Sequence, residues 1–336
     1  QRVNANFSGL VAPYLQDDDL IWVHDYHLIP MANCLRRLGC RQRMGFFLHI
    51  PFPVPSVAQA IPRIDELLDA MCSYDRLGFQ TEDDRKAFVA LCRERRPEIP
   101  VPNTGVYPIG VDPRALQKEA EAEPVVRLWP QNGAVQGILS VDRLDYTKGL
   151  PERFRAFGRY LERHPDERGR LTFLQIAPVS RGDVAEYRHL RDQLEGIAGH
   201  INGTHAEPDW TPLRYVNRNF GHATLTGFYR LASLALVTPL RDGMNLVAKE
   251  YVAAQNPENP GVLVLSMLAG AAAELDAALL VNPYDLDGVA DAISRAASMP
   301  LPERRERWES MMRPITEFDI HAWCARFLER LARTTG

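Results

Sequence analysis

The feature that most constrains the fold is a series of short apolar runs in which apolar residues are continuous rather than alternating. Such runs are typical of strands that are buried on both faces of a parallel sheet. They extend over Leu20–His24, Met44–Ile50, Arg76–Thr81, Gly105–Gly110, Gln136–Val141, Leu171–Ala177, Leu234–Pro239, Val262–Ser266 and Leu279–Asn282. Amphipathic segments typical of helices lie between them, at Ser56–Tyr74, Glu82–Arg95, Leu150–Arg163, Asp183–Ile197 and Leu246–Gln255. This recurring order predicts an α/β protein with doubly wound, Rossmann-like sheets.

A charged, proline-containing stretch at Lys118–Gly133 interrupts this order without a clear strand pattern. The length of 336 residues fits two domains of ordinary size. We therefore predict a first Rossmann-like lobe over residues 1–122 and a second over residues 133–316. Residues 317–336 are expected to form a C-terminal helix that packs back toward the first lobe.

Composition excludes several classes of protein. The formal net charge of −4, with acids and bases mixed along the chain, argues against nucleic acid or an anionic membrane as a partner. The sequence contains no stretch of eighteen or more apolar residues, so we expect no transmembrane helix. The five cysteines form no CxxC pair and show no zinc-ligand spacing, so we expect free thiols in a reducing cytoplasm.

Polar residues follow the first two apolar runs, where a parallel sheet places its ligands. Asp25 lies in the string His24–His27, and its carboxylate either accepts a hydrogen bond from a sugar hydroxyl or only caps a turn. His49 follows the second run and precedes two prolines that stiffen the loop. For a single histidine both a structural and a functional role stay open.

Basic residues follow the first two runs of the second half. Arg143 and Lys148 come just before a predicted helix, whose N-terminus attracts anions, so a diphosphate is the natural ligand. The alternative is two solvated bases beside a turn. Arg181 also precedes a helix and is placed to meet a phosphate or a sugar hydroxyl, although its Ser-x-x-Asp context is also an ordinary helix start.

The most informative stretch is Thr238–Glu250, in which a strand ends, a small turn follows, and a helix begins near Leu246. Free amides at that helix start can bind phosphate oxygens. Glu250 lies four residues beyond Leu246 on the same helical face, from which a carboxylate can bind ribose hydroxyls. Asp242 in the turn is placed to bind hydroxyls of a transferred sugar. The alternative is a capped helix with an exposed glutamate.

Two common nucleotide motifs are absent from the sequence. It contains neither GxGxxG nor GxxxxGK[ST], which argues against a dinucleotide dehydrogenase and a P-loop enzyme. The run Asp17–Asp19 has no partner cluster, and we interpret it as a solvated turn. The sequence therefore predicts neither a metal site nor a cofactor.

Several strings together resemble, in this order, the motifs of the trehalose-6-phosphate synthase family. They are HDYHL, GFFLHIPFP, LGFQTEDDR, VDRLDYTKGLPERF, IAPVSRGDV, TPLRDGMNLVAKEYVA and LVNPYD. The family consists of retaining glycosyltransferases with two Rossmann-like lobes that face each other across a cleft, the GT-B arrangement. The resemblance implies glucose transfer from UDP-glucose to glucose 6-phosphate with retention and without a metal.

The resemblance also assigns roles to individual residues. Arg143, Lys148, His49 and Asp242 are the implied catalytic residues: Arg143 and Lys148 contact the diphosphate, while His49 and Asp242 lie beside the donor glucose. The implied donor-binding residues are Gly243, Met244 and Asn245 at the glucose, the amides of Leu246 and Val247 at the phosphates, and Glu250 at the ribose. The implied acceptor-binding residues are Asp25, Tyr26 and Arg181.

Members of this family usually begin upstream of the first residue here, with a segment that completes the acceptor pocket. We therefore expect the N-terminal lobe to be incomplete. Two alternatives stay open: a related transferase with another acceptor, such as glycerol 3-phosphate in glucosylglycerol-phosphate synthases, and a non-catalytic sugar-phosphate sensor. The nucleotide base of the donor and self-association into a homo-oligomer are not decided by the sequence.

Overall fold

The computed structural model describes residues 2–122, 128–129, 135–178 and 185–334. The chain divides into two compact units. Unit 1 comprises Gln1–Gly110 and Ile320–Gly336, and unit 2 comprises Val111–Asp319. Helix α6 (Pro113–Ala122), which our division assigned to the first lobe, packs against α9 and α10 of unit 2.

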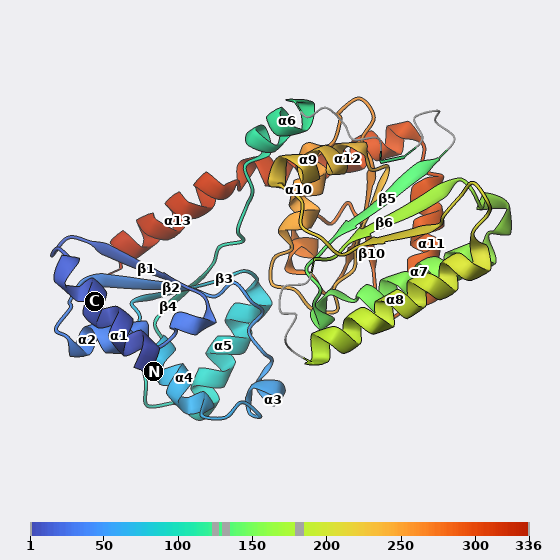
Figure 1. Cartoon of the computed structure of the whole chain (residues 1–336). Coiled ribbons are helices and arrows are strands. Elements are labelled where there is room, and N and C mark those ends of the chain that lie inside the picture. The colour runs from blue at the N-terminus through green and yellow to red at the C-terminus, as the bar shows by residue number, and fades with distance from the viewer. Residues whose placement is uncertain (1, 123–127, 130–134, 179–184, 335–336) are drawn as a thin grey trace. The chain divides into compact units, whose positions relative to one another are not determined.

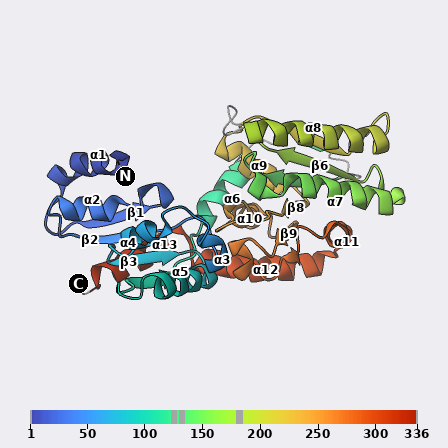
Figure 2. The ribbon, with the colours of Figure 1, turned by 90° about the horizontal axis from the view of Figure 1, so that it is seen from below.

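Unit 1 is built around a parallel sheet in the order β1-β2-β3-β4 (Figure 1). Its strands are β1 (Leu20–His24), β2 (Arg43–Phe47), β3 (Arg76–Phe79) and β4 (Asn103–Val106). Its helices are α1 (Arg2–Val11), α2 (Met31–Arg37), α3 (Pro55–Ala58), α4 (Ile64–Met71), α5 (Glu82–Arg95) and α13 (Ile320–Ala332). Figure 2 shows α1 beside α2, with which it is in contact.

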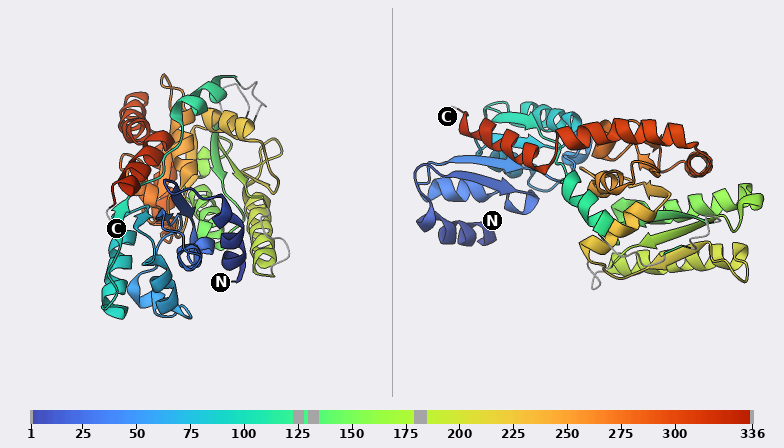
Figure 3. Two further views of the ribbon diagram at one scale, coloured as in Figure 1. Left: turned by 90° about the vertical axis from the view of Figure 1, so that its left-hand side faces the viewer. Right: turned by 90° about the horizontal axis from the view of Figure 1, so that it is seen from above.

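Helix α13 covers β1 and β2 of this sheet (Figure 3). Its Phe327 is fully buried, and the sheet makes room for this ring with two glycines. A Cβ atom would lie 2.7 Å from the Phe327 ring at Gly45 and 2.9 Å from it at Gly78. Since real Cβ atoms do not approach so closely, the two glycines permit the helix to pack on the sheet.

Unit 2 contains a six-stranded parallel sheet in the order β10-β9-β8-β5-β6-β7. Its strands are β5 (Gln136–Val141), β6 (Leu171–Ile176), β7 (Leu213–Val216), β8 (Leu234–Val237), β9 (Val262–Ser266) and β10 (Leu279–Val281). Besides α6, its helices are α7 (Leu150–Arg163), α8 (Ala185–His205), α9 (His222–Leu231), α10 (Leu246–Ala254), α11 (Leu286–Ala297) and α12 (Leu301–Glu317).

The helices of unit 2 form two groups, α7, α8 and α11 in one and α6, α9, α10 and α12 in the other. Figure 1 shows α7 and α8 on one side of the strands and α9, α10 and α12 on the other. The chain begins the sheet at β5, builds outward through β6 and β7, and then returns to β8 on the other side of β5. This reversal is the topological switch point of a doubly wound sheet, where ligands bind.

The predicted α/β class with parallel sheets is confirmed, but some predicted elements are wrong. The segment Ser56–Tyr74 is not one helix, because Pro62 and the left-handed backbone of Arg63 (φ 59°) separate α3 from α4. Strand β7 was missed, since its four residues, with one exposed and two half-buried side chains, lack a buried run. None of the helices in the described ranges has the length and apolarity that crossing a lipid bilayer requires.

We predict that Phe327→Ala lowers the free energy of unfolding of unit 1 by about 3–5 kcal/mol, because the lost ring leaves a cavity between α13 and the sheet. Calorimetric unfolding measures this change. Glu329→Ala, at an exposed position of the same helix, is the control and is expected to stay within about 0.5 kcal/mol of wild type. A loss below about 1 kcal/mol for Phe327→Ala would contradict the packing described.

Candidate functional site

The loops that follow β5 and β8 meet at the switch point of the unit 2 sheet. The first carries Arg143 and Lys148, and the second carries the turn at Asp242. The backbone N–H of Leu240 donates to the carbonyl of Thr147 at 2.8 Å, so the two loops are in direct contact. Residues that are distant in sequence therefore come together where this fold binds ligands.

A carboxylate lies at the centre of this contact. The Nζ atom of Lys148 lies 2.7 Å from Oδ2 of Asp242, and Nδ2 of Asn245 donates to the same oxygen at 2.8 Å. The N–H of Gly243 donates to Oδ1 of Asp242 at 3.1 Å. The side chains of Lys148 and Asp242 stay 15% and 18% exposed, so a ligand can reach both. The structure thus joins Lys148, Asp242, Gly243 and Asn245 in one polar cluster.

Helix α10 begins directly beside this cluster. Asn245 is its N-cap, and its Oδ1 accepts the N–H of Ala248 at 3.0 Å. The amides of Leu246 and Val247 precede Ala248 and have no carbonyl partner within the helix. They add to the positive end of the helix dipole, which favours an anion at this point.

Glu250 lies one turn further along α10. The phenol of Tyr229 donates a hydrogen bond to its Oε2 at 3.2 Å. Burial raises the pKa of the Glu250 carboxyl, and the Tyr229 bond acts in the opposite direction. Glu250 is half-buried rather than exposed, so the alternative of a solvated surface glutamate is wrong.

Two other predicted donor-site residues, Met244 and Arg143, and the predicted acceptor-binding residue Arg181 differ in their surroundings. Met244 is buried next to the cluster. Arg143 is exposed and forms no hydrogen bond or ion pair with any residue in the described part of the chain. A cation that is unpaired among the described residues suits a charged ligand. Arg181 lies outside the described residues.

The sequence analysis missed Arg153, whose side chain is fully buried in unit 2. Its guanidinium forms an ion pair with Asp142 and donates to Oε1 of Gln175 at 3.0 Å and to Oγ1 of Thr238 at 2.8 Å. It also donates to the carbonyl of Lys148 at 3.0 Å. One side chain thus connects the end of β5, β6, the end of β8 and the Lys148 turn.

A sequence pattern could have identified Arg153. It falls three residues after Leu150 and one before Phe154, on the apolar face of an amphipathic helix where a charge needs a partner. The preceding Gly149 has a left-handed backbone (φ 64°), and a Cβ there would lie 2.5 Å from the carbonyl of Thr238. Glycine therefore allows the Lys148 turn to approach the end of β8.

The remaining predicted residues belong to unit 1, at the ends of β1 and β2. Asp25 has a left-handed backbone (φ 69°), which is strained for a residue with a side chain. Its N–H donates to the carbonyl of Phe47 at 2.8 Å, and its Oδ1 is buried without a partner among the described residues. Tyr26 is exposed beside it, and His49 contacts His24. A buried oxygen without a donor is suited to a ligand hydroxyl.

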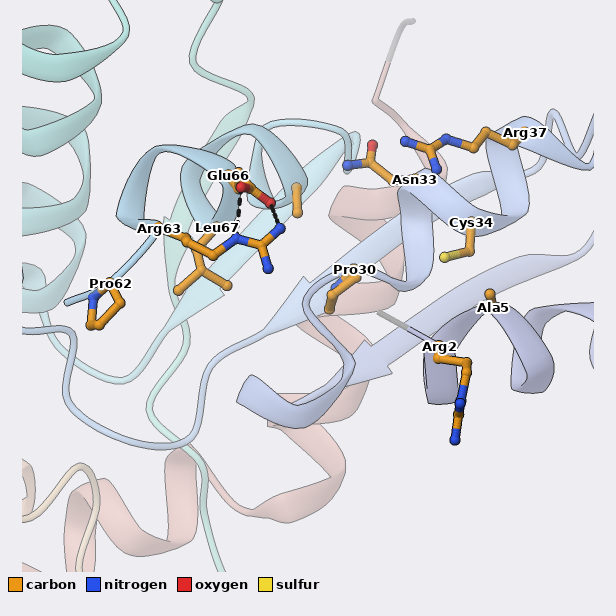
Figure 4. A pocket seen from close by; sticks show the side chains of 11 residues that line it. Arg2, Ala5, Pro30, Asn33, Cys34, Arg37, Pro62, Arg63, Glu66 and Leu67 are labelled. Carbon is orange, nitrogen blue, oxygen red and sulfur yellow. Dashed lines mark hydrogen bonds and ion pairs between the residues drawn. The ribbon is translucent and has the colours of Figure 1, made fainter.

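A separate hollow of about 430 Å³ lies in unit 1 between α1, α2 and α4 (Figure 4). Arg63 and Glu66 form an ion pair at its rim, with Nε of Arg63 2.7 Å from Oε1 of Glu66. None of the predicted site residues lines it, and it carries no functional assignment. Within the described residues, no group of three or more His, Cys, Asp or Glu side chains is arranged to hold a metal ion.

We predict that Arg153→Met lowers the free energy of unfolding of unit 2 by about 3–5 kcal/mol, because it leaves the Asp142 carboxylate buried without its partner. Denaturant unfolding measures the change. Arg155→Met is the matched control, since its ion pair on the same helix is exposed and contributes at most about 1 kcal/mol. Adding Asp142→Asn to Arg153→Met is expected to recover part of the loss, and a single-variant loss no larger than that of the control would contradict the network.

Comparison with known proteins gives consistent results. The chain matches the profile of Glycosyltransferase family 20 over residues 1–333. It is 50% identical to the trehalose-6-phosphate synthase of Enterobacter sp. (strain 638), over 99% of this chain and 73% of that protein.

Solved structures agree with the fold. One, described as "Trehalose-6-phosphate from E. coli bound with UDP-2-fluoro glucose", superposes with a TM-score of 0.96 at 50% identity and covers 99% of this chain and 77% of that chain. An α,α-trehalose-phosphate synthase (UDP-forming) from Burkholderia xenovorans, in complex with glucose-6-phosphate, has a TM-score of 0.95 at 48% identity and covers 98% and 77%. The predicted resemblance is thus confirmed, and the chain belongs to glycosyltransferase family 20.

Proposed function

We propose that the protein transfers glucose from UDP-glucose to glucose 6-phosphate with retention at the anomeric carbon, producing α,α-trehalose 6-phosphate and UDP. The observation that carries this proposal is the cluster of Lys148, Asp242 and Asn245 at the N-terminus of α10. It combines a cation, a carboxylate and free amides, which suit a diphosphate with a sugar attached. The relatives described as binding UDP-2-fluoro glucose and glucose-6-phosphate support both substrates.

In this proposal unit 2 binds the donor. Arg143, Lys148 and the amides of Leu246 and Val247 bind the diphosphate. Asp242 accepts hydroxyl hydrogens of the glucose, beside Gly243, Met244 and Asn245. Glu250, whose carboxylate is already oriented by Tyr229, accepts the ribose hydroxyls.

Asp25 and Tyr26 of unit 1 bind the acceptor in this proposal. The partnerless Oδ1 of Asp25 accepts a hydroxyl of glucose 6-phosphate, and the exposed phenol of Tyr26 lies next to it. His49 binds the glucose of the donor. Arg181 binds the acceptor phosphate in this proposal, on the basis of the family resemblance alone.

The chemistry follows from the charge that develops on the leaving group. As the bond between the anomeric carbon and the diphosphate oxygen breaks, negative charge grows on that oxygen, and Arg143, Lys148 and the α10 amides stabilise it. The same oxygen takes the proton of the attacking acceptor hydroxyl on the same face of the sugar, which retains the configuration. Neither a metal ion nor a cofactor takes part in this proposed path.

We also infer a cytoplasmic location, supported by the five cysteines, all of which are free thiols. Whether the protein forms a homo-oligomer is tested by measuring its molar mass in solution.

An acceptor panel tests the function. The protein, expressed from its complete gene, is incubated with UDP-glucose and either glucose 6-phosphate or glycerol 3-phosphate, and UDP release and the product linkage are measured. We expect the faster turnover with glucose 6-phosphate and an α,α linkage. Faster turnover with glycerol 3-phosphate would show that glycerol 3-phosphate, not glucose 6-phosphate, is the acceptor. Donor binding without transfer to either acceptor would favour a non-catalytic sensor.

We predict that Arg143→Ala weakens UDP binding by roughly 1.5–3 kcal/mol, about 10- to 150-fold, through loss of a charge-assisted contact to the diphosphate. Because Arg143 is exposed and unpaired among the described residues, the variant is expected to unfold like the wild type. Calorimetric titration measures the affinity, with Arg313→Ala on the exposed face of α12 as the control. Equal UDP affinity in the Arg143→Ala and Arg313→Ala variants would show that the diphosphate binds elsewhere.

A further inference from the structure

Two imidazole rings are in contact at the ends of β1 and β2 in unit 1. Nδ1 of His24 lies 3.1 Å from Nε2 of His49, and the ring centroids are 5.3 Å apart. His24 is the last residue of β1 and pairs in register with Phe47, two residues before His49. In such a contact one nitrogen carries the hydrogen and the other accepts it. The hydrogen position on His49 is therefore coupled to that on His24.

Aromatic rings surround the pair and restrict its orientation. Trp22 lies 4.5 Å from His24 and Phe47 lies 4.8 Å from His49, measured between ring centroids. Trp323 of α13 lies 6.1 Å from His24 and 6.2 Å from His49. Both rings thus pack against fixed neighbours, so the contact between them is a defined part of the fold.

The surroundings also favour a neutral pair. Burial lowers the pKa of both rings, and the charge of His49 lowers that of His24 further. The carboxylate of Asp25 acts on both rings in the opposite direction. A pair with both rings charged would have a hydrogen on each contacting nitrogen, which breaks the bond, so the contact requires that at least one ring is neutral.

The direction of the bond follows from the chemistry of neutral imidazole. A neutral histidine side chain in water prefers to carry its hydrogen on Nε2 rather than Nδ1. Only one arrangement lets both rings keep that form: Nε2–H of His49 donates to Nδ1 of His24. In the reverse arrangement both rings would take the less favoured form.

We propose that His24 is a positioning residue for His49. By accepting the Nε2–H of His49, it fixes that ring in the form whose Nδ1 is a bare acceptor, ready for a hydroxyl of the bound sugar. The hydrogen bond between the two rings is inferred from the geometry of unit 1 alone. The role of His49 in binding the sugar rests on the proposed function.

Nuclear magnetic resonance of the ring nitrogens tests the bond in the protein without substrate. We expect His49 to be protonated on Nε2 and bare on Nδ1, with an Nε2–H that exchanges slowly with water. In His24→Phe, which keeps a ring but removes the acceptor, that exchange is expected to accelerate at least about tenfold. His24→Asn, whose Oδ1 can accept in place of Nδ1, is expected to restore slow exchange.

His189→Phe, at an exposed position of α8, is the control for the loss of an imidazole and is expected to leave the His49 signals unchanged. A hydrogen on Nδ1 of His49 in the wild type, or unchanged exchange in His24→Phe, would overturn the proposal. If His24→Phe does not fold, the hydrogen position on His49 in the wild type and the exchange rate of its Nε2–H in His24→Asn still test the proposal.

Kinetics test the positioning role. In the glucosyl transfer, kcat/KM is expected to fall about tenfold in His24→Phe and to recover in His24→Asn. An unchanged kcat/KM in His24→Phe would overturn the positioning role. Absence of transfer in the wild-type protein would instead overturn the proposed function, and the ring nitrogens would still decide between the two forms of His49.

Discussion

The candidate site of unit 2 depends on the buried guanidinium of Arg153. A buried charged side chain is stable only when its N–H groups donate hydrogen bonds to partners. Arg153 donates to Asp142, Gln175, Thr238 and the carbonyl of Lys148. These partners come from the ends or loops of neighbouring strands. The hydrogen bonds of Arg153 to the Lys148 carbonyl and to Thr238 therefore fix where the Lys148 turn lies relative to the end of β8, before any ligand binds.

This arrangement holds the charged and polar groups of the candidate site at the switch point of the sheet. Lys148 reaches Asp242, and the α10 amides add positive charge near this carboxylate, which Asn245 also binds. Arg143, which is unpaired among the described residues, follows the neighbouring strand β5. Such preorganised groups stabilise developing charge without having to reorganise during the reaction. The chain belongs to glycosyltransferase family 20, and the proposed glucose transfer, in which a nucleotide diphosphate leaves, agrees with that membership.

Much of this was predictable from sequence, and what was not has a common physical cause. The continuous runs predicted the parallel strands, and the stretch Thr238–Glu250 predicted the start of α10, because both depend on local pattern. The Arg153 network and the His24–His49 contact depend on which strands are neighbours and in what register, which no local pattern specifies. The break between α3 and α4 was missed because the amphipathic pattern continues across Pro62 and Arg63.

The measurement that tests the central claim most directly is a calorimetric comparison of UDP with uridine as ligands of the protein. If the cluster at the α10 N-terminus binds a diphosphate, UDP binds at least about 100-fold more tightly than uridine, since charge-assisted contacts contribute roughly 1.5–3 kcal/mol each. Equal affinity for the two, or no binding of UDP to folded protein, would contradict the claim that this cluster is a nucleotide-diphosphate site.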